Sequence, residues 1–529
     1  MIKSSLLFCL MLFVLTGSAQ TKTVSYSGSF KGYTKDFPFK TGKIILLNEI
    51  TGITETYLID VAADGKFAAS FPLEKAKECY VWFPYFYRTV YFEPGKRIVH
   101  NIDISNINEV QSTFSGDLAK SNNDQIRLWP LITSRSAELH ARAIEHMTPD
   151  QYKAYYLNLL QKNLASLDSI KKGSGLDEGA YQRAVISLKL GTAEQLIQYN
   201  YHIENEYRKN NNISFADKKP VLKERILDES YYDFLKTIRF NDPKNMVSAD
   251  YFIFIMRLKT LELILDRARI DYSAEIARLE KDSTQAGHRE TLQLLRKAQN
   301  NKVFNADSVK SLRPGILKRL AGADITLELE LIEMQDICQV INDNQTPLSE
   351  DGLARVKARL KNKQLFPAVA AFNRQLVEKL EANKTKTGFV NNKTPNVAAD
   401  SVFNNILKRY KGKTIFIDFW ATWCGPCLQG IKETAALKEE LKDKDIVFLY
   451  ITNTSSPEKS YDGMIPGIKG EHYRLSMDEY NVVAARLGIV GIPHYAIADK
   501  QGVLVENNYR WRDADQIKMN LQRILRENY

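Results

Sequence analysis

Two cysteines separated by two residues, Cys424 and Cys427, are the side chains of this chain with the clearest chemical potential. At this spacing two thiols can close into a disulfide and reopen without a large backbone movement. A helical pattern runs from about Cys427 to Lys442. Unpaired backbone N–H groups and the helix dipole favour a thiolate at such a helix start. The pattern therefore indicates reversible thiol–disulfide exchange.

The segment that leads into the cysteines, residues 414–420, is apolar on both alternating faces except at Thr414 and Asp418. That pattern is typical of a strand buried on both sides in a parallel sheet. An acid in such a strand is costly unless it has a task. We expect burial to raise the pKa of Asp418, so that the carboxylate can accept a proton near neutral pH. A solvated Asp at a strand end is the alternative.

Residues 417–427, Ile-Asp-Phe-Trp-Ala-Thr-Trp-Cys-Gly-Pro-Cys, closely resemble the active-site segment of the thioredoxin family. A second segment, residues 488–493, resembles the thioredoxin loop whose proline is cis and faces the cysteine pair. The resemblance implies that Cys424 is the nucleophile and Cys427 the resolving thiol. It also implies that Asp418 accepts the resolving thiol's proton.

The same resemblance assigns the residues around the pair. Pro493 is expected to be cis and to hold the Ile492 backbone beside the sulfurs, where it aligns a substrate strand. Trp423 is expected to shield the disulfide. The dipeptide Gly425-Pro426 accompanies a reducing potential in thioredoxins.

A bare Cys-x-x-Cys also occurs in zinc sites and in structural disulfides. The sequence shows no second Cys or His pair to complete a zinc site, so it predicts no metal and no cofactor. Cys338 lies on a helical apolar stripe and Cys79 precedes an aromatic run, so we interpret both as buried core thiols.

Three positions depart from the expected family pattern. The TlpA/ResA branch commonly carries Glu and Pro soon after the second cysteine, and residues 428–432 lack both. His494 stands where thioredoxins usually have Thr, and either tunes the thiolate or points to solvent. The lysine that often partners the buried acid is replaced near Tyr450.

The N-terminus has the layout of an export signal. Lys3 supplies a positive charge, and Leu6 to Leu15 form an apolar stretch too short to span a bilayer with its flanks. Small residues at 17–19 offer a cleavage site, so that Gln20 would begin the mature chain. We expect a periplasmic or otherwise exported, soluble protein that does not span a membrane after the signal is removed.

A chain of 529 residues exceeds one ordinary domain. The formal charge of +10 is spread along the chain without a Lys/Arg block, which argues against nucleic acid as a partner. The expected fold is multidomain, with an N-terminal β-sandwich, a large all-α middle region and a C-terminal α/β thioredoxin fold. The boundaries are a signal peptide over 1–19, the sandwich over 20–118, the helical domain over 119–390 and the thioredoxin-like domain over 391–529.

The β-rich part contains turn signals at Asp64-Gly65 and at residues 93–96, and an aromatic run over 81–92. The aromatic run is either an ordinary core or a binding platform. This part resembles the β domains ahead of exported TlpA-like thioredoxin domains. The helical part has an N-cap signal at Thr148 and another at Ser349, and it offers no catalytic constellation.

The first hypothesis is an exported thiol–disulfide oxidoreductase that reduces protein disulfides. Because the cell exterior is oxidising, it implies a membrane thiol carrier as electron donor. The second is a scaffold or partner-binding protein that carries a secondary redox domain. The third is an AhpC/TSA-type peroxidase, which needs Thr three residues before the reactive cysteine, where this chain has Ala421.

Overall fold

The computed structural model describes residues 22–34, 37, 39–141, 144–214, 220–281, 286–300, 303–489, 491–509 and 514–526. The expected signal peptide over 1–19 lies outside the described residues. None of the helices among the described residues combines the length and apolar character needed to cross a membrane.

The N-terminal strands form one sheet with the order β6-β5-β2-β3-β4-β1-β7-β8. Only β1 and β7 pair in parallel among its neighbours. Gly65 and Gly95 have positive φ, as the two predicted turns require. The strands are β1 (Lys22–Lys31), β2 (Thr41–Leu47), β3 (Thr54–Val61), β4 (Lys66–Leu73), β5 (Lys77–Phe83), β6 (Phe86–Phe92), β7 (Arg97–Asp103) and β8 (Gln111–Gly116).

This sheet curls around a single apolar core. Phe86 on the edge strand β6 packs against His100 on β7, near the opposite edge, with ring centroids 5.2 Å apart. Hydrogen bonds join all eight strands into one sheet, where the sequence analysis expects a sandwich. Phe83 and Phe86 of the aromatic run are buried in the core, while Tyr85 and Tyr87 are exposed. Part of the run therefore serves as core, and part of it faces solvent.

The middle of the chain is helical. Thr148 forms a capping box with Gln151 at the start of α2, and Ser349 caps α11, as the sequence predicts. Cys338 and Cys79 are buried free thiols. The helices are α1 (Ala119–Ala141), α2 (Pro149–Ser174), α3 (Glu178–Ile197), α4 (Tyr199–Asn210), α5 (Ala249–Lys259), α6 (Glu262–Arg267), α7 (Ser273–Lys281), α8 (Ala286–Asn300), α9 (Ala306–Ala321), α10 (Thr326–Asp343), α11 (Glu350–Arg359) and α12 (Phe366–Asn383).

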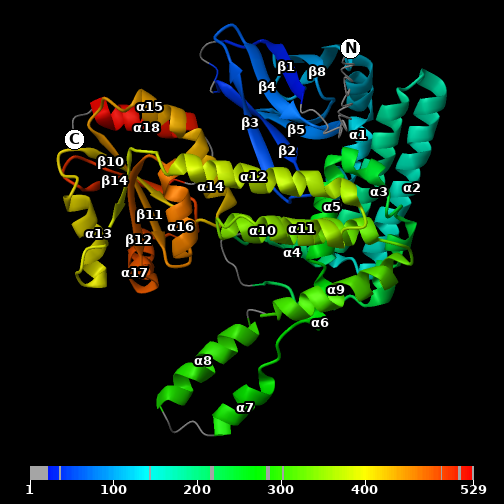
Figure 1. Cartoon of the computed structure of the whole chain (residues 1–529). Helices are drawn as coiled ribbons and strands as arrows, with labels where there is room; N and C mark the ends of the chain where they lie inside the picture. The colour runs from blue at the N-terminus through cyan, green and yellow to red at the C-terminus, as the bar shows by residue number, and fades with distance from the viewer. Residues whose placement is uncertain are drawn as a thin grey trace, which may run out of the picture.

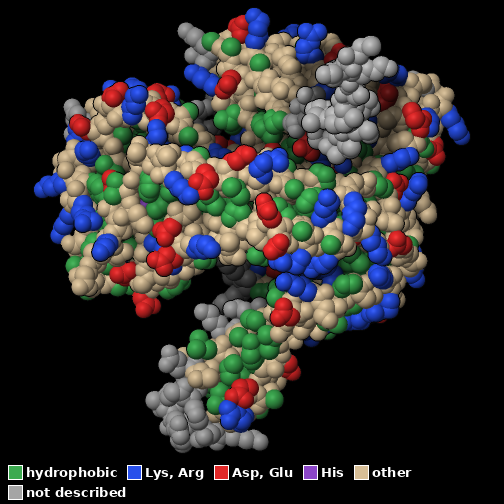
Figure 2. Space-filling model, in the orientation of Figure 1, with side chains coloured by type: hydrophobic (Ala, Val, Ile, Leu, Met, Phe, Trp, Pro, Cys, Tyr) green, Lys and Arg blue, Asp and Glu red, His purple; other side chains and the backbone are tan. Residues whose placement is uncertain are grey.

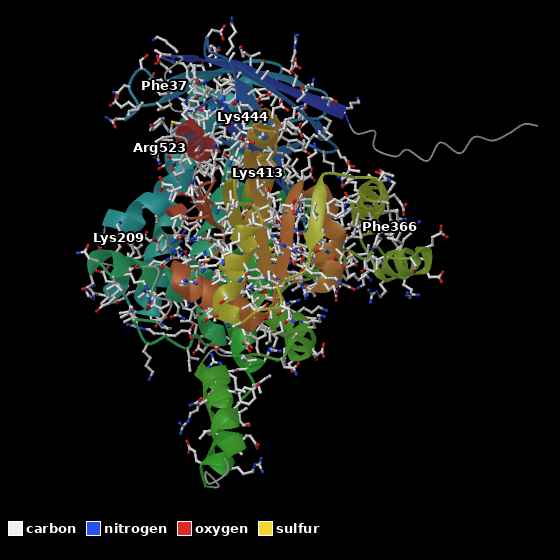
Figure 3. All side chains as sticks on the ribbon, turned by 90° about the vertical axis from the view of Figure 1, so that its left-hand side faces the viewer. Phe37, Lys209, Phe366, Lys413, Lys444 and Arg523 are labelled. Atoms are coloured by element: carbon white, nitrogen blue, oxygen red, sulfur yellow. A yellow bond between two sulfur atoms is a disulfide. The ribbon has the colours of Figure 1, made fainter. Side chains whose placement is uncertain are left out.

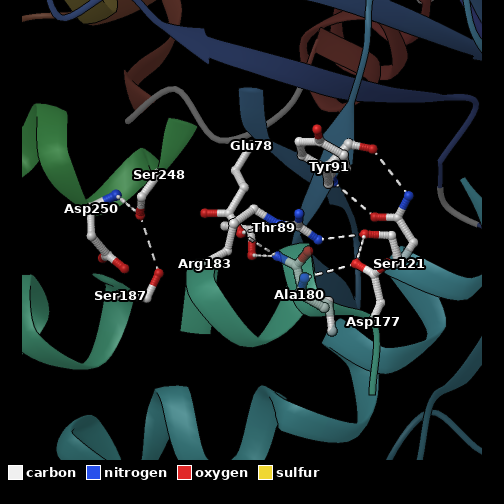
Figure 4. A network of polar contacts seen from close by, with 12 residues as sticks. Glu78, Thr89, Tyr91, Ser121, Asp177, Ala180, Arg183, Ser187, Ser248 and Asp250 are labelled. Atoms are coloured by element: carbon white, nitrogen blue, oxygen red, sulfur yellow. Dashed lines mark hydrogen bonds and ion pairs between the residues drawn. The ribbon is translucent and has the colours of Figure 1, made fainter. Parts of the chain in front are cut away.

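A buried polar network fastens the sheet to the helices (Figure 4). The Arg183 guanidinium on α3 lies 3.8 Å from the Tyr91 ring and donates to Ser121 Oγ over 2.7 Å. Arg183 Nε also lies 3.5 Å from a carboxylate oxygen of Glu78 on β5. Burial raises the pKa of Glu78 to about 7, although the charge of Arg183 opposes that rise. The two regions therefore share a charged contact that is closed to water.

The C-terminal domain is a six-stranded sheet with the order β14-β13-β10-β11-β12-β9. Strands β10, β11, β12 and β9 are parallel, and β13 and β14 are antiparallel to their neighbours. Strand β9 spans the boundary that the sequence places between residues 390 and 391. The strands are β9 (Phe389–Asn392), β10 (Thr414–Phe419), β11 (Ile446–Asn453), β12 (Gly470–Leu475), β13 (His494–Ala498) and β14 (Leu504–Tyr509).

Helices cover both faces of this sheet, and they pack into two separate apolar cores. One core contains both cysteines, and the other lies against α13 and α17. The helices are α13 (Ala399–Lys408), α14 (Gly425–Glu433), α15 (Ala435–Glu440), α16 (Glu458–Met464), α17 (Met477–Leu487) and α18 (Ala514–Arg526).

The C-terminal domain lies beside the helical region and below the N-terminal sheet (Figure 1). Lys413 and Lys444, which precede β10 and β11, lie on the side nearest that sheet (Figure 3). The carboxyl ends of these parallel strands therefore face away from it. Lys43 on β2 forms an ion pair with Glu433 at the end of α14, on the side near the sheet. Figure 2 shows Lys/Arg and Asp/Glu side chains intermixed over the visible face.

Candidate active site

The two cysteines lie at the start of α14, a few residues after the end of β10. All six residues of β10 are buried, and Cys424 is the N-cap residue of α14. A disulfide joins Cys424 to Cys427, whose Cα atoms are 5.2 Å apart. The Cys427 backbone N–H donates to Cys424 Sγ over 3.2 Å. The side chain of Cys424 is 5% exposed and that of Cys427 is 0% exposed, so an incoming group meets Cys424 first.

The residues next to the pair leave Cys424 approachable. Trp423 is 57% exposed, and its indole Nε1 donates to Ser455 Oγ over 3.1 Å. A Cβ atom built on Gly425 would meet nothing within 4 Å, so the space beside the first helical residue is open. Pro426 occupies the first turn, where its missing N–H leaves no helical bond unmade.

The second predicted segment borders the core that contains the pair. The Ile492–Pro493 peptide bond is cis, which confirms that prediction. Ile492 is partly buried and packs against both apolar cores of the domain, one of which contains the cysteines. Val490 lies outside the described residues.

Asp418 is buried on the face of the sheet that carries the cysteines, because it alternates along β10 with Phe416 of the same core, and 1% of its surface is exposed. Its register partners on the neighbouring strands are Tyr450 and Tyr495. Burial raises the pKa of Asp418 to about 8, and the charge of Lys438 opposes that rise. Oδ1 of Asp418 has no hydrogen-bond partner among the described residues. The carboxyl group therefore changes protonation state close to neutral pH, as the sequence predicts.

Lys438 on α15 supplies a cation for the buried acid, in place of the family lysine that is replaced near Tyr450. Its ammonium lies 4.7 Å from the centroid of the Tyr450 ring and donates to the Lys469 carbonyl over 3.1 Å. Burial lowers the pKa of Lys438 to about 8, and the charge of Asp418 opposes that change. The acid and the amine therefore titrate as a coupled pair.

The sequence pattern predicts one helix from Cys427 to Lys442, and it gives no sign that Lys438 lies close to Asp418. In the structure α14 ends at Glu433 and α15 begins at Ala435. Between them the Thr434 hydroxyl donates to the carbonyl of Gly430 over 3.0 Å. Back-bonding of this kind often bends helices, and beyond Thr434 the Lys438 ammonium lies over the Tyr450 ring. A Thr inside an expected helix is the sequence signal that could have indicated the junction between α14 and α15.

The comparison with family models concerns this same part of the chain, because residues 389–517 match the Redoxin family. These residues form a Redoxin domain. Thiol-disulfide oxidoreductase ResA of Bacillus anthracis is 28% identical over 120 residues, which are 22% of this chain and 67% of ResA. The thioredoxin-like protein YneN of Bacillus subtilis is 29% identical over 108 residues, which are 18% of this chain and 57% of YneN.

A solved thioredoxin domain of a thiol-disulfide oxidoreductase from Bacteroides vulgatus is 22% identical to this chain. It covers 22% of this chain and 84% of its own, with a TM-score of 0.21. The family model and the curated relatives show that the Redoxin domain is a thioredoxin-like thiol–disulfide oxidoreductase. The match begins at Phe389, so it leaves the N-terminal sheet and the helical region outside the family model.

His494 in the Redoxin domain does not adopt either of the two roles considered from the sequence. It pairs with Phe419, whereas the next residue, Tyr495, pairs with Asp418. Because side chains alternate along a strand, His494 lies on the face of the sheet opposite to the cysteines. There its ring packs against Phe419 and lies 2.9 Å from Asn507 Oδ1, and it is buried. It neither reaches the thiols nor points to solvent.

No group of three or more His, Cys, Asp or Glu side chains that could hold a metal ion occurs in the described part of the chain.

Proposed function

We propose that this protein is an exported oxidoreductase that reduces disulfides in other proteins. Cys424 is the nucleophile, because it is the cysteine that a substrate meets first and because a helix N–H group points at its sulfur. Trp423 and the backbone of Ile492 contact the substrate beside Cys424, the less buried of the two cysteines. Gly425-Pro426 and Pro493 shape the turn and the loop that border the sulfurs.

The reaction starts from the dithiol. The Cys424 thiolate attacks one sulfur of the substrate disulfide, which forms a mixed disulfide and releases the other substrate sulfur as a thiolate. Asp418 accepts the proton of the Cys427 thiol, and the Cys427 thiolate then attacks Cys424 Sγ. This step releases the second substrate sulfur and leaves the Cys424–Cys427 disulfide seen in the structure. The substrate gains two electrons, and the protein loses two.

A membrane thiol carrier returns the two electrons, since an exported reductase has no cytosolic thiol pool to draw on. The observation that carries this proposal is the difference in exposure between Cys424 and Cys427, together with a buried carboxyl group of raised pKa on the same face of the sheet. The proposal also includes domain limits at 118 and 390 and a signal peptide over 1–19.

Insulin reduction tests the proposal. The Cys424→Ser, Cys427→Ser double variant should lose the activity, because no sulfur remains to exchange. A Cys338→Ser variant is the matched control, since it removes a buried free thiol outside the Redoxin domain and should retain activity. Equal rates for the double variant and the wild type would rule the proposal out. The Cys427→Ser variant should accumulate mixed disulfides with its substrates, which identifies them.

A further inference from the structure

The turn that carries the cysteines is held from outside by the loop after β11. Ser456 Oγ accepts a hydrogen bond from the backbone N–H of Thr422 over 3.0 Å and lies 2.8 Å from Thr452 Oγ1. The neighbouring Ser455 accepts the indole N–H of Trp423. Ser456 is fully buried, so no water replaces its hydroxyl. Two consecutive serines thus hold two consecutive residues of the turn.

The same loop leads directly into α16, which docks on the helical region. The Ser460 hydroxyl donates to the carbonyl of Asp343 at the end of α10. Asn383 Nδ2 at the end of α12 donates to the carbonyl of Gly463 over 3.0 Å. A Cβ atom on Gly463 would lie 2.9 Å from Gln345 Cβ, so the two backbones approach closely. Residues 455–463 therefore reach from the cysteine turn to the helical region.

We propose that Ser455 and Ser456 are positioning residues of the redox site, and that α16 makes the helical region its outer support. The thiolate of Cys424 depends on the N–H of Cys427, which lies 3.2 Å from its sulfur. That alignment depends on the turn, in which Cys424 N donates to the Ala421 carbonyl over 3.0 Å. Without Ser456 the buried Thr422 N–H lacks an acceptor, and the turn must relax to find one.

This inference rests on the proposed role of Cys424, but it can be measured without a substrate. The probe is iodoacetamide, and the readout is the pH dependence of Cys424 alkylation in the reduced protein. We expect Ser456→Ala to raise the apparent pKa of Cys424 and to slow alkylation at pH 7 at least threefold. Ser476→Ala is the matched control, because it removes the N-cap hydroxyl of α17 in the same domain.

An alkylation profile of Ser456→Ala that coincides with the wild type would overturn the proposal, as would an equal shift in Ser476→Ala. If Ser456→Ala does not fold, Thr452→Val takes its place, since it removes only the hydroxyl that contacts Ser456. Ser455→Ala changes an exposed residue. It should leave the pKa of Cys424 unchanged and raise KM for insulin at least twofold, because Trp423 is no longer held. An unchanged KM would remove Ser455 from the proposal.

The far end of α16 is tested by Asn383→Ala. It should shift the Cys424 alkylation profile in the same direction as Ser456→Ala, by a smaller amount. Asn373→Ala is the control, because Asn373 is a buried amide on the same helix that bonds Leu348. Equal Cys424 alkylation profiles for Asn383→Ala and Asn373→Ala would overturn the proposal that the helical region supports the redox site. A wild-type protein that reduces no insulin would refute the proposed function, whereas the alkylation profiles judge the roles of Ser456 and α16 without insulin; only the role of Ser455 is judged by KM.

Discussion

Replacing Lys438 by Met removes the charge that opposes the raised pKa of Asp418. The ammonium of Lys438 lies against the ring of Tyr450, which is the register partner of Asp418 on the neighbouring strand. Met keeps most of the side-chain length and apolar contact but carries no charge. The pKa of Asp418, already about 8, must therefore rise further in this variant.

The size of the effect follows from Coulomb's law. Two unit charges roughly 6 to 8 Å apart interact by about 2 to 3 kcal/mol in an effective dielectric of about 20. Because about 1.4 kcal/mol is tenfold, the carboxylate fraction of Asp418 at pH 7 should fall roughly 30- to 100-fold. The resolving step needs that carboxylate as a base, so its rate should fall by the same factor and recover as the pH rises well above 8.

Rapid mixing of the reduced protein with a labelled disulfide peptide measures this step as the release of the second substrate thiol. Lys438→Arg keeps the charge and should keep the wild-type inflection near pH 8. Lys442→Met removes an exposed lysine from the same segment and should change nothing. If the pH profiles of Lys438→Met and the wild type coincide, the charge of Lys438 does not affect the resolving step through Asp418.

Three further outcomes follow from buried groups. Asp418 binds its proton more tightly in the folded than in the unfolded chain, so the wild type loses stability as the pH rises from about 4 to about 8. Asp418→Asn should therefore unfold at higher urea, with an advantage that grows to a few kcal/mol at pH 8; an advantage independent of pH would contradict this. Arg183→Met leaves Glu78 buried without its cation and should cost about 3 to 5 kcal/mol above pH 7 in urea unfolding. The cost should shrink below pH 7 as Glu78 takes up a proton, and an unchanged midpoint would show that the network is not stabilising. Cys79 and Cys338 should react with a thiol reagent only after denaturation, because burial raises the pKa of both to about 12; a reaction in the native protein would show that one of them is accessible.

Local rules in the sequence are enough to place the chemistry of the Redoxin domain. The buried strand before Cys424 and the acid at position 418 each follow from residue types within a few positions of one another, whereas the cis bond at Pro493 is implied by the resemblance of residues 488–493 to the thioredoxin loop. Helix starts at Thr148 and Ser349 follow from side-chain capping, which is equally local.

Features that depend on long-range packing do not follow in the same way. The single curled sheet depends on contacts such as Phe86 with His100, which no short pattern encodes. Strand β9 forms because residues 389–392, Phe-Val-Asn-Asn, find an open edge of β12, far along the chain. The face that His494 occupies depends on its register with Phe419. Sequence periodicity alone does not fix that register.

The junction at Thr434 has a consequence for how this kind of site can be adjusted. Thr434 takes no part in electron exchange, yet its hydroxyl bonds the Gly430 carbonyl between α14 and α15, the helix that carries Lys438. A substitution here that moves α15 would shift the acidity range in which the protein works, while every reacting atom stays the same. Homologous chains adapted to different ambient acidity are expected to differ here sooner than at their cysteines.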